Sequence, residues 1–295
     1  MTLNLRGELF ELSRPAVMGI INLTSDSFYA SSRVAESDLA AVTEMMLSDG
    51  ADILDLGACS TRPGSRAVSE EEELRRLLPA VIDTRRNFPK AIISVDTFRS
   101  RVARECIEAG ADIVNDISGG DADPEMARLV ADLKVPYIVC HSRGDSASMN
   151  DRCDYEDVAA DVLRSLAFKI DALRQTGVCD VIADPGFGFS KTTDQNFRLL
   201  GALGTFKNLG CPILAGVSRK RMIQETAPSD AAGALNGTTA ANMIALMRGA
   251  DILRVHDVRE AAECVRIYEA YRRNLPEPRI VTTTFGDGKR QVELY

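Results

Sequence analysis

The stretch Gly50-Ala51-Asp52-Ile53-Leu54-Asp55 decides the fold, because the same pattern occurs twice more in the chain. The other copies are Gly110-Ala111-Asp112-Ile113-Val114-Asn115 and Gly249-Ala250-Asp251-Ile252-Leu253-Arg254. Each copy follows a segment with helical spacing and opens a short apolar run. Glycine at a helix end adopts the left-handed conformation without a Cβ clash, and an aliphatic run fits a strand buried on both faces. The repeated unit is therefore a helix, a glycine turn and a parallel strand.

Apolar runs of this kind predict eight strands, the number that a closed parallel barrel requires. They lie at 16–22, 52–57, 91–96, 113–117, 137–142, 181–186, 212–218 and 252–257. The segments between them are long enough for the helices that parallel connections need. The clearest helices are 69–87, which opens on the capping-box pair Ser69 and Glu72, and 157–175. This alternation predicts α/β architecture.

The predicted fold is a (β/α)8 TIM barrel with short hairpin appendages at its N- and C-terminal ends. We assign 1–275 to a single barrel domain and 276–295 to a C-terminal tail that forms a hairpin turning at 286–288. Residues 2–13 predict the other hairpin, which turns at Arg6-Gly7 and closes the bottom of the barrel. A doubly wound open sheet is the alternative, but consecutive units without a G-x-G-x-x-G turn favour the barrel.

Composition excludes several classes of protein. The 295 residues are 45% hydrophobic and 26% charged, which is typical of a globular chain and not of a disordered one. A net charge of −8 repels a phosphate backbone, so nucleic acid is not an expected partner. The 7 cysteines include no C-x-x-C pair, which argues against a disulfide framework. No apolar run reaches the roughly 18 residues of a membrane span and no signal peptide is evident, so we expect no membrane partner and a cytoplasmic location.

Polar side chains follow most of the predicted strands, at the point where each strand ends. They are Asn22, Thr61, Arg62, Asp96, Asn115, Asp116, His141, Arg143, Asp184, the run 218–221 and the run 254–257. In a parallel barrel the carboxyl ends of the strands meet at one mouth, where the βα loops build the active site. The convergence of these residues therefore predicts a functional site at that mouth.

The residues at the strand ends fall into two chemical groups. One group offers hydrogen-bond acceptors and donors for a planar heterocycle such as a pterin or a purine, and consists of Asp96, Asn115, Asp184 and Lys220. The other suits a phosphate or diphosphate that leaves in a displacement, and consists of Arg62, Arg254 and His256, with Asn22 nearby. A heterocycle beside a diphosphate site predicts a transferase.

Seven motifs in one order then resemble the dihydropteroate synthase family over about residues 15–273. They are MGIINLTSDSF at 18–28, STRPG at 60–64, SVDT at 94–97, NDI at 115–117, DPGFGF at 184–189, SRK at 218–220 and RVHD at 254–257. The resemblance implies a TIM barrel, usually a homodimer, that joins 6-hydroxymethyl-7,8-dihydropterin diphosphate to p-aminobenzoate in folate biosynthesis. It also implies Mg²⁺ as cofactor and sulfonamides as inhibitors.

Matched position by position, the resemblance also implies residue roles. The pterin is bound by Asp96, Asn115, Asp184 and Lys220, and the diphosphate by Asn22, Arg62, Arg254 and His256. The p-aminobenzoate subsite consists of Ser60, Thr61, Arg62, Pro63, Phe189, Lys220 and Arg221. Asn22 also lies near the metal, and the loop 24–33 closes over the reacting centre. The implied mechanism is a dissociative displacement, in which diphosphate leaves the pterin methylene and the arylamine attacks the resulting cation.

The chain departs from the family pattern mainly around the acceptor and the metal. The loop 25–32 reads SDSFYASS, with Ala30 where the family carries an acidic residue, and Cys59 replaces a glutamate. Arg221 replaces a serine, and a guanidinium there still binds a carboxylate. Two alternatives therefore stay open: a pterin-binding homologue with a different acceptor or none, and a methyltetrahydrofolate-dependent methyltransferase. The motif STRPG and the absence of a corrinoid module argue against the methyltransferase.

Some of these residues also have structural interpretations. Asn115, Asp116 and Asp257 are of the type that caps helices, and each follows a strand. Arg219 and Arg221 lie on a predicted loop, where a guanidinium is ordinarily solvated. We expect His141 to be a structural histidine and His256, which lies inside the specific motif RVHD, to be a functional one.

Overall fold

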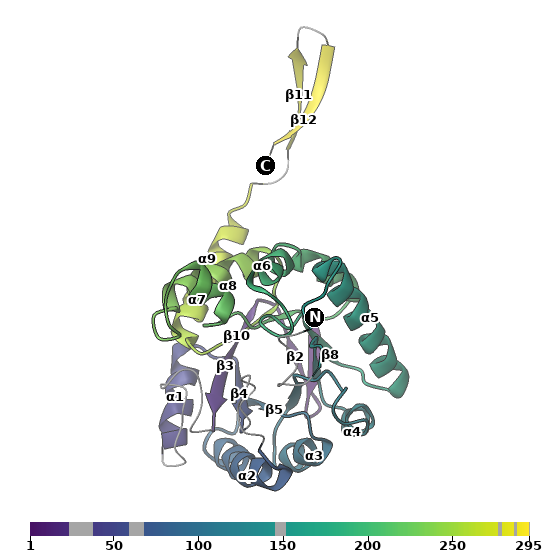
Figure 1. Cartoon of the computed structure of the whole chain (residues 1–295). Helices are drawn as coiled ribbons and strands as arrows, with labels where there is room; N and C mark the ends of the chain where they lie inside the picture. The colour runs from purple at the N-terminus through teal and green to yellow at the C-terminus, as the bar shows by residue number, and fades with distance from the viewer. Residues whose placement is uncertain (24–37, 59–67, 145–151, 277–278, 286–287, 295) are drawn as a thin grey trace.

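The structure is a computed structural model and describes residues 1–23, 38–58, 68–144, 152–276, 279–285 and 288–294. Eight parallel strands form a single sheet in the order β8-β7-β6-β5-β4-β3-β10-β9. A parallel bridge between Ala183 and Ile213 joins the two ends of this order, so the sheet closes into a barrel (Figure 1). The predicted barrel is confirmed.

The strands occupy the predicted runs, and most of them are shorter at the carboxyl end. Their bounds are β3 (Ala16–Asn22), β4 (Ile53–Gly57), β5 (Ile92–Asp96), β6 (Ile113–Asp116), β7 (Tyr137–Cys140), β8 (Val181–Asp184), β9 (Leu214–Ala215) and β10 (Ile252–Val255). The chain turns out of the sheet early where a side chain binds the backbone of the loop. After β8, for example, the Asp184 carboxylate accepts a hydrogen bond from Gly186 N at 2.8 Å.

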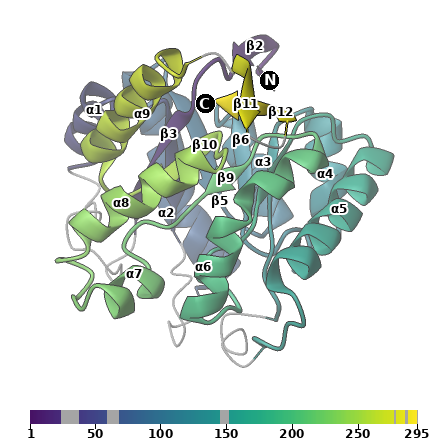
Figure 2. The same cartoon turned by 90° about the horizontal axis from the view of Figure 1, so that it is seen from above.

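Helices surround the barrel and cover the outer face of its strands (Figure 1, Figure 2). Their bounds are α1 (Leu39–Asp49), α2 (Glu70–Asn87), α3 (Ser100–Glu108), α4 (Met126–Leu133), α5 (Val158–Thr176), α6 (Thr193–Gly201), α7 (Arg221–Thr226), α8 (Leu235–Met247) and α9 (Val258–Arg273), with a 3-10 helix at Leu203–Leu209. The helix predicted at 69–87 is confirmed as α2. Ser69 caps it, because its hydroxyl accepts a hydrogen bond from Glu72 N at 3.2 Å. The Glu72 carboxylate turns to Arg76 Nε at 2.5 Å.

Two positions of the repeated Gly-Ala-Asp unit, the glycine and the aspartate, have a structural role. Gly50, Gly110 and Gly249 all have positive φ, of 106°, 115° and 92°, as expected of glycine turns after helices. The aspartates Asp52, Asp112 and Asp251 accept hydrogen bonds from the backbone N–H of Val17, Ile93 and Ile213, at 2.9, 2.7 and 2.8 Å. Each repeated aspartate therefore fixes its strand to the start of the neighbouring one.

Two hairpins flank the barrel, as predicted. The first pairs β1 (Thr2–Leu5) with β2 (Glu8–Glu11), and its Leu3 and Leu5 pack in one apolar cluster with the amino ends of the barrel strands. Figure 2 shows this hairpin at the end of the barrel away from α7. The second hairpin pairs β11 (Arg279–Phe285) with β12 (Gly288–Leu294), and the predicted turn residues 286–287 lie outside the described residues.

Candidate active site

A buried carboxylate, Asp55 of β4, joins the polar side chains at the carboxyl end of the barrel. Its Oδ2 accepts hydrogen bonds from Arg254 Nε at 2.6 Å and from Asn115 Nδ2 at 3.1 Å, while its Oδ1 accepts from Ser94 Oγ at 2.7 Å. Arg254 Nη2 in turn lies 2.6 Å from Asp96 Oδ2. The structure thus brings together Asp96, Asn115 and Arg254, as the sequence predicted.

Asp55 is not among the polar residues predicted at the strand ends, because β4 continues past it to Gly57. A signal for it was present in the sequence. Asp55, Asn115 and Arg254 occupy the same sixth position of the three repeated units. Since the repeats fold alike, their sixth side chains project from equivalent places in the barrel.

Burial and the neighbouring charges both shift the pKa values of Asp96 and Arg254. Burial raises the pKa of Asp96 to about 7, the Arg254 guanidinium opposes that rise, and the Asp55 carboxylate adds to it. Burial also lowers the pKa of Arg254, but the carboxylates of Asp55 and Asp96 outweigh it and hold the net pKa above the ordinary arginine value. Paired with Arg254, the Asp96 carboxylate offers a hydrogen-bond acceptor at the mouth, which suits the N–H edge of a ring.

Lys220 follows β9 and lies against the loop that follows β8. Its Nζ donates to Phe187 O and lies 4.5 Å from the centre of the Phe189 ring. Burial lowers the pKa of Lys220 to about 8, and the Asp184 carboxylate opposes that fall. Gly188 has φ of 79°, and a Cβ there would lie 2.9 Å from Lys220 Cδ, so only glycine lets the lysine cross the loop. The predicted neighbours Asp184, Phe189 and Lys220 are therefore close together.

His256 follows β10 and contacts the loop after β9. Its Nδ1 lies 3.0 Å from Ser218 Oγ. Burial lowers the pKa of His256 to about 3, and the nearby charges of Arg254 and Arg219 act in the same direction. The neutral ring offers a hydrogen bond to an anion bound beside Arg254, and such an anion would raise its pKa. Asn22 ends β3, the strand that pairs with β10.

Arg219 is buried, so the expectation of a solvated side chain was wrong. Its guanidinium forms two bonds of 2.8 Å to the Asp257 carboxylate and one of 2.8 Å to Ala232 O. Such a bidentate pair holds the loop after β9 against the start of α9. Asp257 therefore binds Arg219 and does not cap α9 through its side chain. Arg221, by contrast, is exposed and lies 3.2 Å from Glu225, which leaves its acceptor role a prediction.

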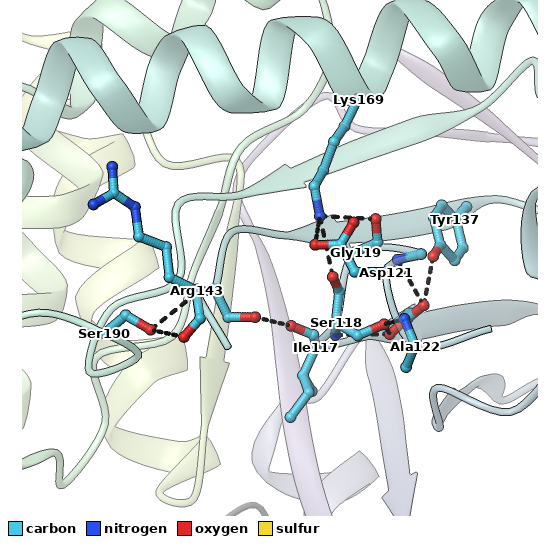
Figure 3. Close-up of polar contacts among 12 residues, drawn as sticks. Ile117, Ser118, Gly119, Asp121, Ala122, Tyr137, Arg143, Lys169 and Ser190 are labelled. Carbon is cyan, nitrogen blue, oxygen red and sulfur yellow. Dashed lines mark hydrogen bonds and ion pairs between the residues drawn. The ribbon is translucent and has the colours of Figure 1, made fainter. Parts of the chain in front are cut away.

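Asp116 stabilises the loop after β6 and not a helix start. Its carboxylate accepts from Tyr137 Oη at 2.6 Å, from Ser118 N at 2.7 Å and from Gly120 N at 3.0 Å. In Figure 3 Lys169 of α5 closes the same loop, donating to Ser118 O and Gly119 O at 3.1 Å. Asn115, the residue before, bonds to Asp55 and so also has no capping role.

His141 has the environment of a structural histidine, as expected. It is buried, and its Nδ1 lies 3.1 Å from Lys191 Nζ. Burial lowers the pKa of His141 to about 2, with Lys191 acting in the same direction. Lys191 also donates to Gly186 O at 2.9 Å and to Phe189 O at 3.0 Å, so it holds together the loop that carries Phe189.

Several predicted residues lie outside the described part of the chain. They are Ser60, Thr61, Arg62 and Pro63, together with the loop 24–33 and its Ala30. Within the described part, no three or more His, Cys, Asp or Glu side chains gather as a metal site. No described helix is long and apolar enough to span a membrane.

Known proteins share both this fold and its motifs. The profile of the pterin binding enzyme family matches residues 18–256. Dihydropteroate synthase of Escherichia coli K12 is 38% identical over 273 residues, which cover 92% of this chain and 96% of that protein. A structure of the Xanthomonas albilineans dihydropteroate synthase with 4-aminobenzoic acid has a TM-score of 0.84 at 38% identity, covering 93% and 99% of the chains. Another, in complex with 7,8-dihydropteroate, has a TM-score of 0.82 at 36% identity, covering 94% and 100%.

The barrel, its polar mouth and the profile match define the class: the chain belongs to the pterin-binding enzyme family. Within that family it is a transferase of the dihydropteroate synthase group, because its match to that group spans nearly the whole of both chains.

Proposed function

We propose that this chain joins 6-hydroxymethyl-7,8-dihydropterin diphosphate to p-aminobenzoate and releases diphosphate. The observation that carries the proposal is the network in which Asp55 connects Arg254, Asn115 and Asp96 at the mouth of the barrel. It presents a guanidinium next to carboxylate and amide groups, which are the partners of a pterin that carries a diphosphate. The relative crystallised with 7,8-dihydropteroate supports the product.

The pterin ring is held by the predicted set Asp96, Asn115, Asp184 and Lys220. Asp184 ends β8, and its charge acts on Lys220, which places an acceptor and a donor on one side of the mouth. Asp96 and Asn115 lie opposite each other on β5 and β6. Carboxylates accept hydrogen bonds from the amino and ring N–H groups of a pterin, while the lysine donates to its carbonyl.

The bond from the pterin methylene to the diphosphate breaks before the amine attacks. Negative charge grows on the diphosphate, where Arg254 and neutral His256 stabilise it, and positive charge grows on the pterin, where Asp96 stabilises it. Because Asp55 and Asp96 hold the guanidinium of Arg254 from two sides, the cation is oriented before the substrate arrives. The amine nitrogen then forms the new bond to the methylene and gives up one proton to the released diphosphate or to water.

Mg²⁺ is proposed as the cofactor, with Asn22 as its protein ligand. An amide oxygen at the end of β3 is a hard donor and fits this ion, which prefers oxygen ligands. Mg²⁺ commonly binds through one or two protein groups, several waters and the phosphates of a substrate, so a cluster of carboxylates is not required. Held there by Asn22, such an ion would supply positive charge to the leaving diphosphate.

The acceptor p-aminobenzoate is proposed to bind beside Phe189 and Lys220, with Ser60, Thr61, Arg62, Pro63 and Arg221 completing the subsite. The support within the described residues is the ammonium of Lys220 above the Phe189 ring, since an aromatic carboxylate finds there both a stacking surface and a cation. The relative crystallised with 4-aminobenzoic acid supports this acceptor. Sulfonamides, which resemble the acceptor, are then expected to compete with it.

A homodimer in the cytoplasm is the proposed assembly and location. Apolar side chains stay exposed on two helices that touch each other, Ile244 and Met247 on α8 and Ile267 and Tyr271 on α9. Such a patch is typical of an interaction surface. The 6 cysteines among the described residues are free thiols, which suits a reducing compartment.

The deciding experiment measures diphosphate release from the pterin diphosphate with Mg²⁺, with and without p-aminobenzoate, and determines the product mass. Release that depends on p-aminobenzoate and yields dihydropteroate supports the proposal. Asp184→Ala should abolish pterin binding, while Asp194→Ala, at an exposed aspartate of α6, should leave it unchanged. Pterin binding without acceptor-dependent release would instead favour the homologue with another acceptor or none.

A further inference from the structure

A buried hydroxyl, that of Ser190, connects the loops after β7 and β8, beside the contact of His141 with Lys191. Ser190 Oγ accepts a hydrogen bond from Arg143 N at 2.9 Å and donates one to Arg143 O at 2.8 Å (Figure 3). The serine is fully buried. One hydroxyl thus satisfies both backbone groups of Arg143, and we name this pair of bonds the Ser190 clasp.

The backbone of Ser190 is held in an unusual conformation. Its φ is 53°, in the left-handed region that residues with a Cβ rarely adopt. Such a conformation persists only where the surroundings fix it, and at functional sites it commonly serves to hold a neighbouring group. Here the surroundings are the clasp on one side and Lys191, which donates to Phe189 O at 3.0 Å, on the other.

Phe189 precedes Ser190 in the chain, and its ring lies 4.5 Å from Lys220 Nζ. Ser190 is bonded to Arg143, and the carbonyl of Phe189 itself accepts from Lys191, so the backbone that carries the Phe189 ring is held in place. Arg143 is itself fixed, because its guanidinium lies 3.9 Å from the centre of the Tyr155 ring. The clasp therefore transmits the position of the loop after β7 to the aromatic surface beneath Lys220.

We propose that Ser190 is a positioning residue for the acceptor: by clasping Arg143 it sets the Phe189 ring against Lys220 and so determines how tightly p-aminobenzoate binds. The inference rests on the proposed function, which assigns Phe189 and Lys220 to the acceptor subsite. Lys220 serves both substrates, but Asp96 and Asn115 on the pterin side belong to the Asp55 network, whose bonds do not involve the clasp. A change at Ser190 should thus act mainly on the acceptor.

The test uses Ser190→Ala and Ser190→Gly, with Ser142→Ala as a matched control. Ser142 lies in the same loop as Arg143, but its hydroxyl donates to Ile117 O at 3.1 Å, in the loop after β6. Steady-state kinetics with each substrate varied in turn give two KM values per variant. Both Ser190 variants should raise the KM for p-aminobenzoate about five- to tenfold, the usual effect of losing one or two hydrogen bonds. The KM for the pterin diphosphate should change less than about twofold, and the control should change neither value.

The two Ser190 variants separate the clasp from backbone strain. If only the left-handed conformation mattered, glycine would relieve it and Ser190→Gly would match or exceed the wild type, whereas loss of the clasp weakens acceptor binding in both variants. Unchanged KM for p-aminobenzoate in Ser190→Ala, or an equal rise in both KM values, would overturn the proposal. Failure of the proposed function is seen separately, as wild-type protein that releases no diphosphate in response to p-aminobenzoate. A thermal unfolding scan of each variant confirms that it is folded.

Discussion

At the scale of single residues, the polar mouth depends on Asp55, a carboxylate that is fully buried and accepts three hydrogen bonds. Removing its charge leaves the partly buried Arg254 with Asp96 as its remaining bonded carboxylate. Because breaking a buried ion pair is strongly destabilising, Asp55→Asn should lower the free energy of unfolding by about 3 kcal/mol. Urea unfolding measures this. In the control variant Asp83→Asn, the ion pair that is lost, between Asp83 and Arg86, is exposed. The free energy of unfolding should therefore fall by less than about 1 kcal/mol. Equal losses would show that Asp55 has no special role.

The two histidines of the chain give a second prediction at this scale. Burial lowers the pKa of His256 to about 3 and that of His141 to about 2, against 6.5 in the unfolded chain. A depressed folded pKa gives stability that is present above 6.5 and is lost as the pH falls towards the folded value. We expect both rings to stay neutral in NMR spectra down to pH 5, while the free energy of unfolding falls below pH 6.5. A ring that titrates near pH 6.5 would contradict this.

Added diphosphate should distinguish the two rings. An anion bound beside Arg254 raises the pKa of His256, because the cationic ring gains an opposite charge. His141 contacts Lys191 on the loop after β8 and should not respond. The NMR signal of His256 is therefore expected to titrate at higher pH with diphosphate than without it, and a parallel response of both rings would place the anion elsewhere.

At the scale of elements, the hairpin of β1 and β2 closes the amino end of the barrel with Leu3, which is 1% exposed. Leu3→Ala removes buried methyl groups from a cluster of strand residues and should lower the free energy of unfolding by about 2–4 kcal/mol. Leu9 on the same hairpin is 77% exposed, and Leu9→Ala should change the free energy of unfolding by less than about 0.5 kcal/mol. Chemical denaturation of both variants provides the comparison. Similar values for the two would mean that the hairpin does not act as a closure.

The sequence predicts the interiors of the strands better than their ends or their long-range contacts. The interior of each strand was predictable, because buried parallel strands are continuous apolar runs after a glycine turn. The carboxyl ends of β3, β4 and β5 were predicted correctly, but those of the other five barrel strands were placed too far along. Bonds such as that from Gly186 N to Asp184 turn the chain before the apolar run ends. Burial of Arg219 was not predicted, because its partner Asp257 lies 38 residues away and the pairing of β9 with β10 brings the two together.

At the scale of the whole molecule, closure of the sheet explains why the site could be predicted in outline. Strand assignment alone places Asp96, Asn115 and Arg254 at one end, because all eight strands run parallel. It does not say which side chains touch, since contacts depend on the stagger of neighbouring strands around the barrel. Arg254 lies beside Met18 in the register, yet its guanidinium reaches Asp55 and Asp96 on two other strands. Such contacts follow from barrel geometry and not from spacing in the sequence.

The proposed dimer is the prediction that belongs to the assembled molecule. Met247 on α8 and Ile267 on α9 are 57% and 62% exposed, on helices that pack together. Burying them against a second copy would remove apolar surface from water, so light scattering should give about twice the 32.1 kDa of one chain. Met247→Glu combined with Ile267→Glu should give the monomer, because buried carboxylates without partners oppose association. Phe168→Glu, at a side chain of α5 that is 78% exposed, should leave the mass unchanged. A wild-type monomer, or dissociation by the Phe168 control, would contradict an interface on α8 and α9.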